Sequence, residues 1–115
     1  MVGNVRDLPG LEIRTNEAKA AVMKVLVSPA EGWDSHVLRV IEVGVGGYTP
    51  KHRHPWPHIN YVIEGEGELM INGQTTSVTA GSYAFVPGDE LHQFRNAGQT
   101  TFRFLCIVPK EGHKV

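Results

Sequence analysis

Short runs of β-branched or alternating residues, each ended by glycine, proline or Asn-Gly, most constrain what this chain can fold into. The 115 residues include 13 glycines and 7 prolines, and these interrupt every longer periodic segment. Strands bounded in this way are typical of a sandwich or a barrel. We predict strands over residues 22–27, 36–43, 51–54, 58–63, 67–71, 74–79, 82–86, 91–95 and 101–108. The predicted fold class is therefore all-β.

The Asn72-Gly73 pair between two predicted strands gives the most definite local prediction. A type I′ turn needs positive φ at both central residues, and asparagine and glycine accept this conformation. We therefore expect a two-residue hairpin here, which sets the register of the strands on either side.

Alternation along two predicted strands indicates which side chains face the interior. In the last strand the apolar phase consists of Phe102, Phe104, Cys106 and Val108. We expect this phase to face inward, which makes Cys106 an interior thiol. In residues 36–43 the phase richer in β-branched side chains also contains Arg39. Arg39 either points inward or snorkels at the rim, because a buried guanidinium requires a partner.

Length, charge and cysteine content exclude several classes of protein. A chain of 115 residues fits a single domain, residues 1–115. Its 11 Lys and Arg against 12 Asp and Glu indicate no nucleic-acid partner. No apolar run approaches the ~18 residues of a membrane span or suggests a signal peptide, so we expect a cytoplasmic protein. One cysteine excludes an intrachain disulfide and multi-cysteine metal motifs, which leaves histidine or carboxylate as metal ligands.

The stretch HRHPWPH, residues 52–58, contains three of the six histidines. On an extended chain His52 and His54 point to the same side, because successive side chains alternate. His58 begins the next predicted strand after the stiff Pro-Trp-Pro turn. This arrangement would let one segment offer several imidazoles to one metal ion.

A fourth histidine, His92, follows a turn at the start of a distant predicted strand. Two strand-and-turn units that each deliver histidine into one barrel would suit a bound ion. The remaining histidines are expected at the surface: His36 opens a strand on its less apolar phase, and His113 lies in the C-terminal tail as a solvated residue.

Two segments of the chain resemble the two motifs of the cupin superfamily. Residues 46–65 follow G-x5-H-x-H-x3-E-x6-G at every position but one. Residues 81–96 resemble G-x5-P-x-G-x2-H-x3-N, and the 15 residues between the segments match the short spacing of small microbial cupins. The resemblance implies a single-domain cupin β-barrel, a double-stranded β-helix of the jelly-roll type.

The chain departs from these motifs at two positions. The glycine of the second motif would fall at Asp89, whereas Gly88 lies one place earlier. Aspartate tolerates left-handed and turn conformations, so we expect the turn to persist with altered detail. The larger departure is His58, which stands where cupins usually place a glutamate ligand.

Small cupins that carry H-x-H-P-W-x-H in this place, such as manganese cupins of thermophilic bacteria, are four-histidine metal proteins, and this sequence resembles them. The expected metal ligands are His52, His54, His58 and His92. The resemblance favours Mn²⁺, with Fe²⁺ next, whereas ligand type alone equally admits Zn²⁺, Ni²⁺ or Cu²⁺. Without a carboxylate ligand such a site keeps the full charge of a divalent cation and attracts anionic ligands.

Further side chains are expected around the metal. Phe94 shares a phase with His92, Phe104 and Cys106 face the same interior, and Arg39, if inward, could hold a substrate carboxylate or enolate. Ordinary barrel core is the other interpretation of each aromatic ring. Cys106 is expected to be core first and redox-reactive second.

The resemblance implies a small-molecule metalloenzyme of the cupin dioxygenase type, an oxidoreductase that cleaves its substrate oxidatively. A decarboxylase or isomerase is less favoured, because the loss of the glutamate removes the obvious general base. The alternative is a non-enzymatic cupin that binds or senses a metal or a small ligand. Cupins usually cover their edge strands by pairing, so a homodimer is also expected.

Overall fold

The computed structural model describes residues 1–15 and 17–113, and this part of the chain forms nine strands and three short 3-10 helices, with no α-helix. The strands are β1 (Leu11–Glu12), β2 (Lys19–Val27), β3 (His36–Tyr48), β4 (His58–Glu64), β5 (Glu66–Ile71), β6 (Gln74–Thr79), β7 (Tyr83–Val86), β8 (His92–Asn96) and β9 (Phe102–Pro109). The 3-10 helices are η1 (Val5–Asp7), η2 (Pro29–Glu31) and η3 (Lys110–Gly112). The predicted all-β class is confirmed.

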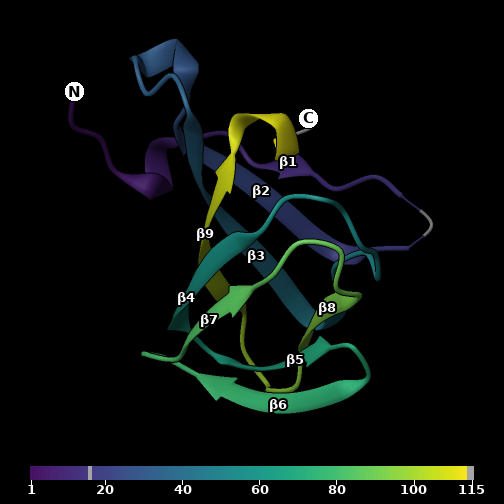
Figure 1. Ribbon diagram of the computed structural model, residues 1–115. Helices are drawn as coiled ribbons and strands as arrows, with labels where there is room; N and C mark the ends of the chain where they lie inside the picture. Colours follow the sequence, from purple (N-terminus) through teal and green to yellow (C-terminus); the bar gives the residue numbers. More distant parts are fainter. Residues whose placement is uncertain (16, 114–115) are drawn as a thin grey trace.

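One antiparallel sheet curls around the interior of the molecule. Its strand order is β6-β5-β8-β3-β9-β4-β7, while β2 pairs with β3 and β1 with β2. In Figure 1, β2 and β3 run behind the open barrel, β4 and β7 lie in front, and β5 and β6 close one end. This curled sheet is the expected jelly-roll-like barrel, and it places the start of β4 and the start of β8 around one interior.

Strand β9 lies between β3 and β4 and supplies the centre of the core. Its buried side chains are those of the predicted phase, Phe102, Phe104, Cys106 and Val108. Phe104 stacks on Phe94 of β8 with ring centroids 4.1 Å apart, an arrangement that adds ~0.5–1.5 kcal/mol to the area term. Phe102 packs against the backbone of Gly67 on β5, where a Cβ would lie 2.4 Å from the ring.

The predicted hairpin is confirmed, since Asn72 and Gly73 have φ of 49° and 82° and join β5 to β6. The predicted strand over 51–54 is wrong. Only His52 pairs there, in an isolated bridge with His92. Prolines at 50, 55 and 57 flank this segment and have no N–H to donate, so it cannot sustain a ladder. Strand β1 and the 3-10 helices were not predicted.

Candidate metal centre

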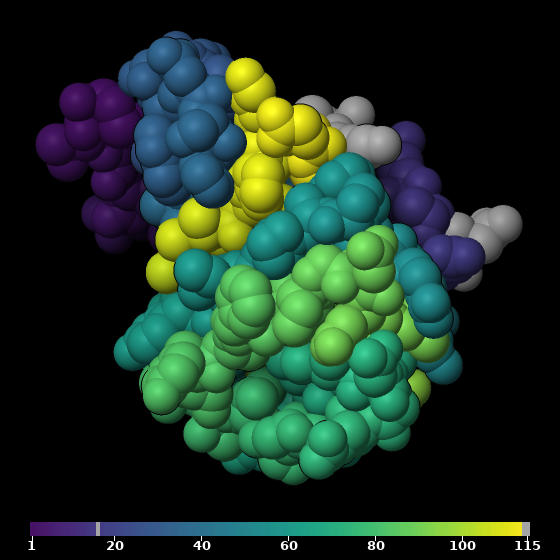
Figure 2. All heavy atoms as spheres, in the orientation of Figure 1, coloured from purple at the N-terminus to yellow at the C-terminus, as the bar shows by residue number. Residues whose placement is uncertain are grey.

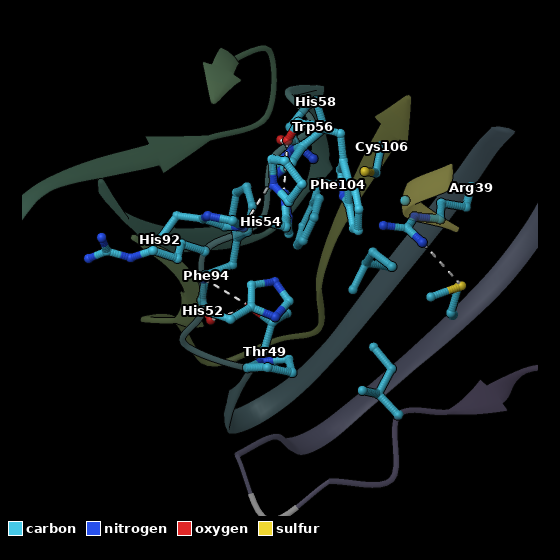
Figure 3. A pocket seen from close by; sticks show the side chains of 18 residues that line it. Arg39, Thr49, His52, His54, Trp56, His58, His92, Phe94, Phe104 and Cys106 are labelled. Carbon is cyan, nitrogen blue, oxygen red and sulfur yellow. Dashed lines mark hydrogen bonds between the residues drawn. The ribbon is translucent and has the colours of Figure 1, made fainter. Parts of the chain in front are cut away.

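The structure brings the four predicted histidines together at one wall of the barrel interior (Figure 3). The ligand atoms offered by His52, His54 and His92 all lie within 4.8 Å of one another. His58 joins this group through its Nε2 atom, which is 3.2 Å from Nε2 of His92. His52 and His54 therefore share a site although their segment is a loop rather than a strand.

Backbone contacts between two distant loops hold this arrangement. His52 and His92 exchange N–H to carbonyl hydrogen bonds of 3.2 and 3.0 Å. Asp89 donates its N–H to the His54 carbonyl over 2.7 Å and takes a left-handed conformation with φ of 64°. Gly88 lets the turn approach the first loop, because a Cβ there would lie 2.3 Å from the Pro55 carbonyl oxygen. Gly88 thus allows the turn to lie close to the Pro55 carbonyl, and Asp89 takes the left-handed conformation that the turn requires.

Three of the histidine rings are oriented by an oxygen acceptor at Nδ1. Nδ1 of His54 lies 2.8 Å from the Trp56 carbonyl, and Nδ1 of His92 lies 2.9 Å from the Glu90 carbonyl. A carbonyl oxygen only accepts hydrogen bonds, so in a neutral ring Nδ1 carries the proton and Nε2 keeps its lone pair. The Nε2 atoms of these rings are therefore available as ligands.

His58 is oriented by the side chain of Asn60, two residues further along β4. Nδ2 of Asn60 donates to the Leu105 carbonyl over 3.2 Å, which directs Oδ1 toward Nδ1 of His58 at 2.6 Å. Nε2 of His58 then also keeps its lone pair and faces the lone pair of His92. Two such lone pairs repel each other unless a cation lies between them, and nitrogen ligands bound at about 2.1 Å are themselves roughly 3 Å apart. The donor set therefore fits a divalent transition metal.

Removal from solvent favours the neutral form of three imidazoles in the cluster, those of His52, His58 and His92. The pKa of His58 is lowered to about 3, first by burial and then by the neighbouring His92. The pKa of His52 is lowered to about 4 by burial and then by His92, His54 and Arg39. Burial also lowers the pKa of His92. The neutral form is the one that ligates a metal.

The histidines open onto a cavity of about 480 Å³. The four predicted substrate-binding residues line it: Arg39, Phe94, Phe104 and Cys106. No aspartate or glutamate is among the described residues that line it. The cavity can therefore hold a largely apolar molecule against the histidines, with no carboxylate side chain to act as a base.

Arg39 points inward rather than snorkelling at the rim. Its Nη1 lies 3.9 Å from Met23 Sδ and donates to Nδ1 of His113 over 3.3 Å, while its Nε is buried without a hydrogen-bond partner among the described residues. The expectation of a solvated His113 was wrong, because η3 turns the chain back and leaves His113 partly buried against Arg39. Burial and Arg39 lower the pKa of His113.

Sequence reasoning also missed Asn60 and the position of Trp56. Asn60 is two residues from His58 on the same face of a strand, so alternation alone would have placed it beside that ring. The indole of Trp56 stacks on His54 at 4.9 Å between centroids. A Cβ on Gly112 would lie 2.4 Å from the indole, so the C-terminal segment packs directly on this loop. Figure 2 shows that segment in yellow against the teal surface of the loop.

The family model described as "Cupin domain" matches residues 39–108, a range that contains all four histidines and the four predicted cavity residues. The chain belongs to the cupin family. The polyketide cyclase RemF from Streptomyces resistomycificus is 33% identical in sequence and superimposes with a TM-score of 0.89, covering 96% of this chain and 79% of its own. The predicted oxalate decarboxylase of Thermotoga maritima is 25% identical with a TM-score of 0.85, covering 95% of this chain and 98% of its own.

Curated relatives extend the family likeness. The 1-methylthio-D-xylulose 5-phosphate methylsulfurylase of Rhodospirillum rubrum is 34% identical over 77 residues, which is 67% of this cupin and 49% of that enzyme. This cupin thus spans about half the length of that relative. The polyketide synthase CurC of Streptomyces cyaneus is 28% identical over 110 residues, covering 89% of this chain and 71% of its own. In the described part of the chain, no helix has the length and apolar character needed to cross a membrane.

Proposed function

We propose that this cupin is a metal-dependent enzyme that closes a ring in a small enolisable carbonyl compound of the polyketide type. The observation that carries the proposal is the placement of four imidazoles at one wall of an apolar cavity, three of them with Nε2 left free by a hydrogen bond at Nδ1. The likeness to RemF and CurC, which covers most of the chain, supports the class of substrate.

His52, His54, His58 and His92 would hold the cation. When bound, a divalent cation polarises carbonyl oxygens and stabilises enolates as a Lewis acid. The resemblance to four-histidine cupins favours Mn²⁺, while Fe²⁺, Zn²⁺, Ni²⁺ and Cu²⁺ are the alternatives that imidazole ligands accept. Metal analysis of protein purified without added metal distinguishes among these ions.

The remaining cavity residues bind and orient. The stacked Phe94 and Phe104 rings offer a flat apolar surface to a planar substrate and exclude water from it. No carboxylate side chain lines the cavity in the described part of the chain, which disfavours reactions that depend on an aspartate or glutamate base. A planar compound that enolises on a cation fits this environment.

Oxidative cleavage of the dioxygenase type is the second candidate, favoured by the same apolar surface, which would keep water away from a reacting carbon.

Ring closure, oxidative cleavage and simple binding differ in their products, so one assay distinguishes them. A tetraketide thioester mimic is incubated with metal-loaded protein under nitrogen and under air, with an oxygen electrode and mass spectrometry. Ring closure with loss of water and without oxygen uptake supports the cyclase. Uptake of one O₂ per turnover identifies a dioxygenase, and unchanged mimic bound in stoichiometric amount identifies a binding module.

His92→Ala should abolish turnover in this assay. His36→Ala is the matched control, because His36 stacks on Trp33 outside the cluster, with centroids 5.2 Å apart. Loss of turnover in both variants, or no turnover of any carbonyl mimic by fully metal-loaded wild type, would refute the enzymatic proposal.

We also propose that two copies of the chain pair through the outer face of β4 and β7. This face carries exposed apolar side chains in cross-strand register, Ile59 opposite Phe85 and Tyr61 opposite Tyr83. Tyr83 is 84% and Phe85 60% exposed, and β7 ends the sheet order with one backbone edge free of a described neighbour. In a two-fold dimer each copy presents the same surface, so this apolar face and the free edge of β7 can pack against the same face and edge of a second copy. Analytical ultracentrifugation should show a dimer for the wild type and a monomer for Phe85→Lys.

A further inference from the structure

Within residues 1–15 and 17–113, no negatively charged group pairs with the guanidinium of Arg39. None of the ion pairs among the described residues includes Arg39, and no carboxylate lines the cavity. Its Nη1 contacts only the weak acceptor Met23 Sδ and a neutral ring nitrogen of His113. Its buried Nε has no hydrogen-bond partner in the described part of the chain. A buried, unsatisfied donor on a charged group needs an explanation, and an absent anionic ligand supplies one.

We propose that Arg39 binds a carboxylate at the end of the ligand remote from the histidines, so that this cupin accepts flat apolar acids that carry an oxygen donor at the other end. This proposal rests on the proposed function, because the oxygen donor at the other end of the ligand would bind the cation held by the histidines. Guanidinium offers a carboxylate two parallel N–H donors, and the free Nε is one of them.

The sheet register places Arg39 in the same row as a residue that contacts the histidine cluster. Arg39 on β3 and Asn60 on β4 are both cross-strand neighbours of Cys106 on β9, so they lie in one row across three strands. With strands ~4.8 Å apart, their Cα atoms are roughly 10 Å from each other. Asn60 holds His58, so this row connects the guanidinium to the histidine cluster.

Between these two ends the cavity is apolar. Figure 3 shows Arg39 on one side, His52 and His92 on the other, and Phe104 between them. Ile41, the cross-strand partner of Phe104, also lines the cavity. A rigid ring or conjugated chain between a carboxylate and an oxygen donor matches this order of charge, apolar surface and metal ligands.

The C-terminal segment completes the carboxylate end. His113 accepts a hydrogen bond from Arg39 Nη1, and Gly112 lines the cavity beside it. This contact engages Nη1 and leaves Nε without a hydrogen-bond partner among the described residues.

Calorimetric titration with trans-4-hydroxycinnamate and its methyl ester tests the proposal. The primary measurement uses metal-free protein, so that preference for the acid cannot arise from a bound cation. Wild type should bind the acid at least tenfold more tightly than the ester. Arg39→Gln should bind the two equally, whereas Arg53→Gln, which changes an exposed arginine on the same cavity, should keep the wild-type preference.

Equal affinity of the wild type for acid and ester, or an undiminished preference in folded Arg39→Gln, would overturn the proposal. Arg39→Lys keeps the charge but loses the paired donors, and it should show an intermediate preference. If metal-loaded protein turns over no carbonyl mimic while metal-free wild type still prefers the acid through Arg39, the proposed function fails and the carboxylate site stands.

Discussion

Replacing Asn60 with leucine should weaken cation binding as well as lower the stability of the fold. The loss of cation affinity should exceed that of a variant that is destabilised to a similar extent at a site away from the histidines. Asn60 is 2% exposed, and its amide joins the Leu105 carbonyl to the ring of His58. Leucine has nearly the same shape but neither donor nor acceptor. Nδ1–H of His58 then loses its acceptor, and the proton can move to Nε2, the nitrogen that faces His92.

Two buried polar groups would lose their partners in this variant. At ~1–3 kcal/mol for each group, the free energy of unfolding should fall by about 2–6 kcal/mol. Loss of an acceptor that orients a histidine ligand lowers metal affinity by roughly 10- to 100-fold. Asn60→Asp retains an acceptor for His58 and should therefore keep most of the affinity.

Chelator competition with Mn²⁺ and Zn²⁺ measures the affinity, and urea denaturation measures the stability. Asn96→Leu is the control, because Asn96 makes hydrogen bonds to the Val43 and Thr100 carbonyls away from the cluster. It should lose stability and keep metal affinity. Nitrogen-15 shifts of the His58 ring in metal-free wild type report the tautomer directly. A ring protonated at Nε2, or wild-type affinity in folded Asn60→Leu, would refute the reasoning.

Three further outcomes are expected. Because burial lowers the pKa of His58 from 6.5 to about 3, only the unfolded chain binds that proton between these values. In metal-free protein, His58 alone should therefore lower the free energy of unfolding by about 2 kcal/mol between pH 7 and pH 5. The lowered pKa values of His52 and His92 act in the same direction, so urea denaturation should show at least this loss. Phe104→Ala should cost about 3–5 kcal/mol of unfolding free energy, whereas Phe104→Leu should cost much less if the cavity tolerates repacking. Gly67→Ala should lower the stability by about 1–3 kcal/mol through overlap with Phe102, and an unchanged thermal midpoint would contradict this packing.

The strand predictions were correct where the alternating pattern was not interrupted by residues, such as proline, that prevent strand pairing. Phe102 and Phe104 lie on one face of β9 because the side-chain period of a strand is two, and both are buried as predicted. Asn72-Gly73 formed the expected turn because few residue pairs accept two positive φ angles. These features depend on neighbours in sequence, which is why they could be predicted.

The loop that carries His52 and His54 shows where this reasoning stops. Alternation predicted a strand, but the surrounding prolines remove the donors that a ladder needs, and the rings meet through the bridge to His92 instead. The contact between Arg39 and His113 depends on the direction in which the chain turns after β9. Local sequence pattern does not determine that direction, so His113 was assigned to solvent.

The histidine cluster assembles from segments far apart in the chain, since the Nε2 atoms that meet at 3.2 Å belong to residues 34 positions apart. Closing a loop of that length costs roughly 3 kcal/mol of chain entropy before the two rings can share a cation. The unfolded polypeptide can offer only the nearby histidines of one segment, His52, His54 and His58, without His92, which makes it a weaker competitor for the ion. Cation uptake should accordingly report completion of the barrel during refolding, and an excess of ion over its dissociation constant should protect the native state by mass action.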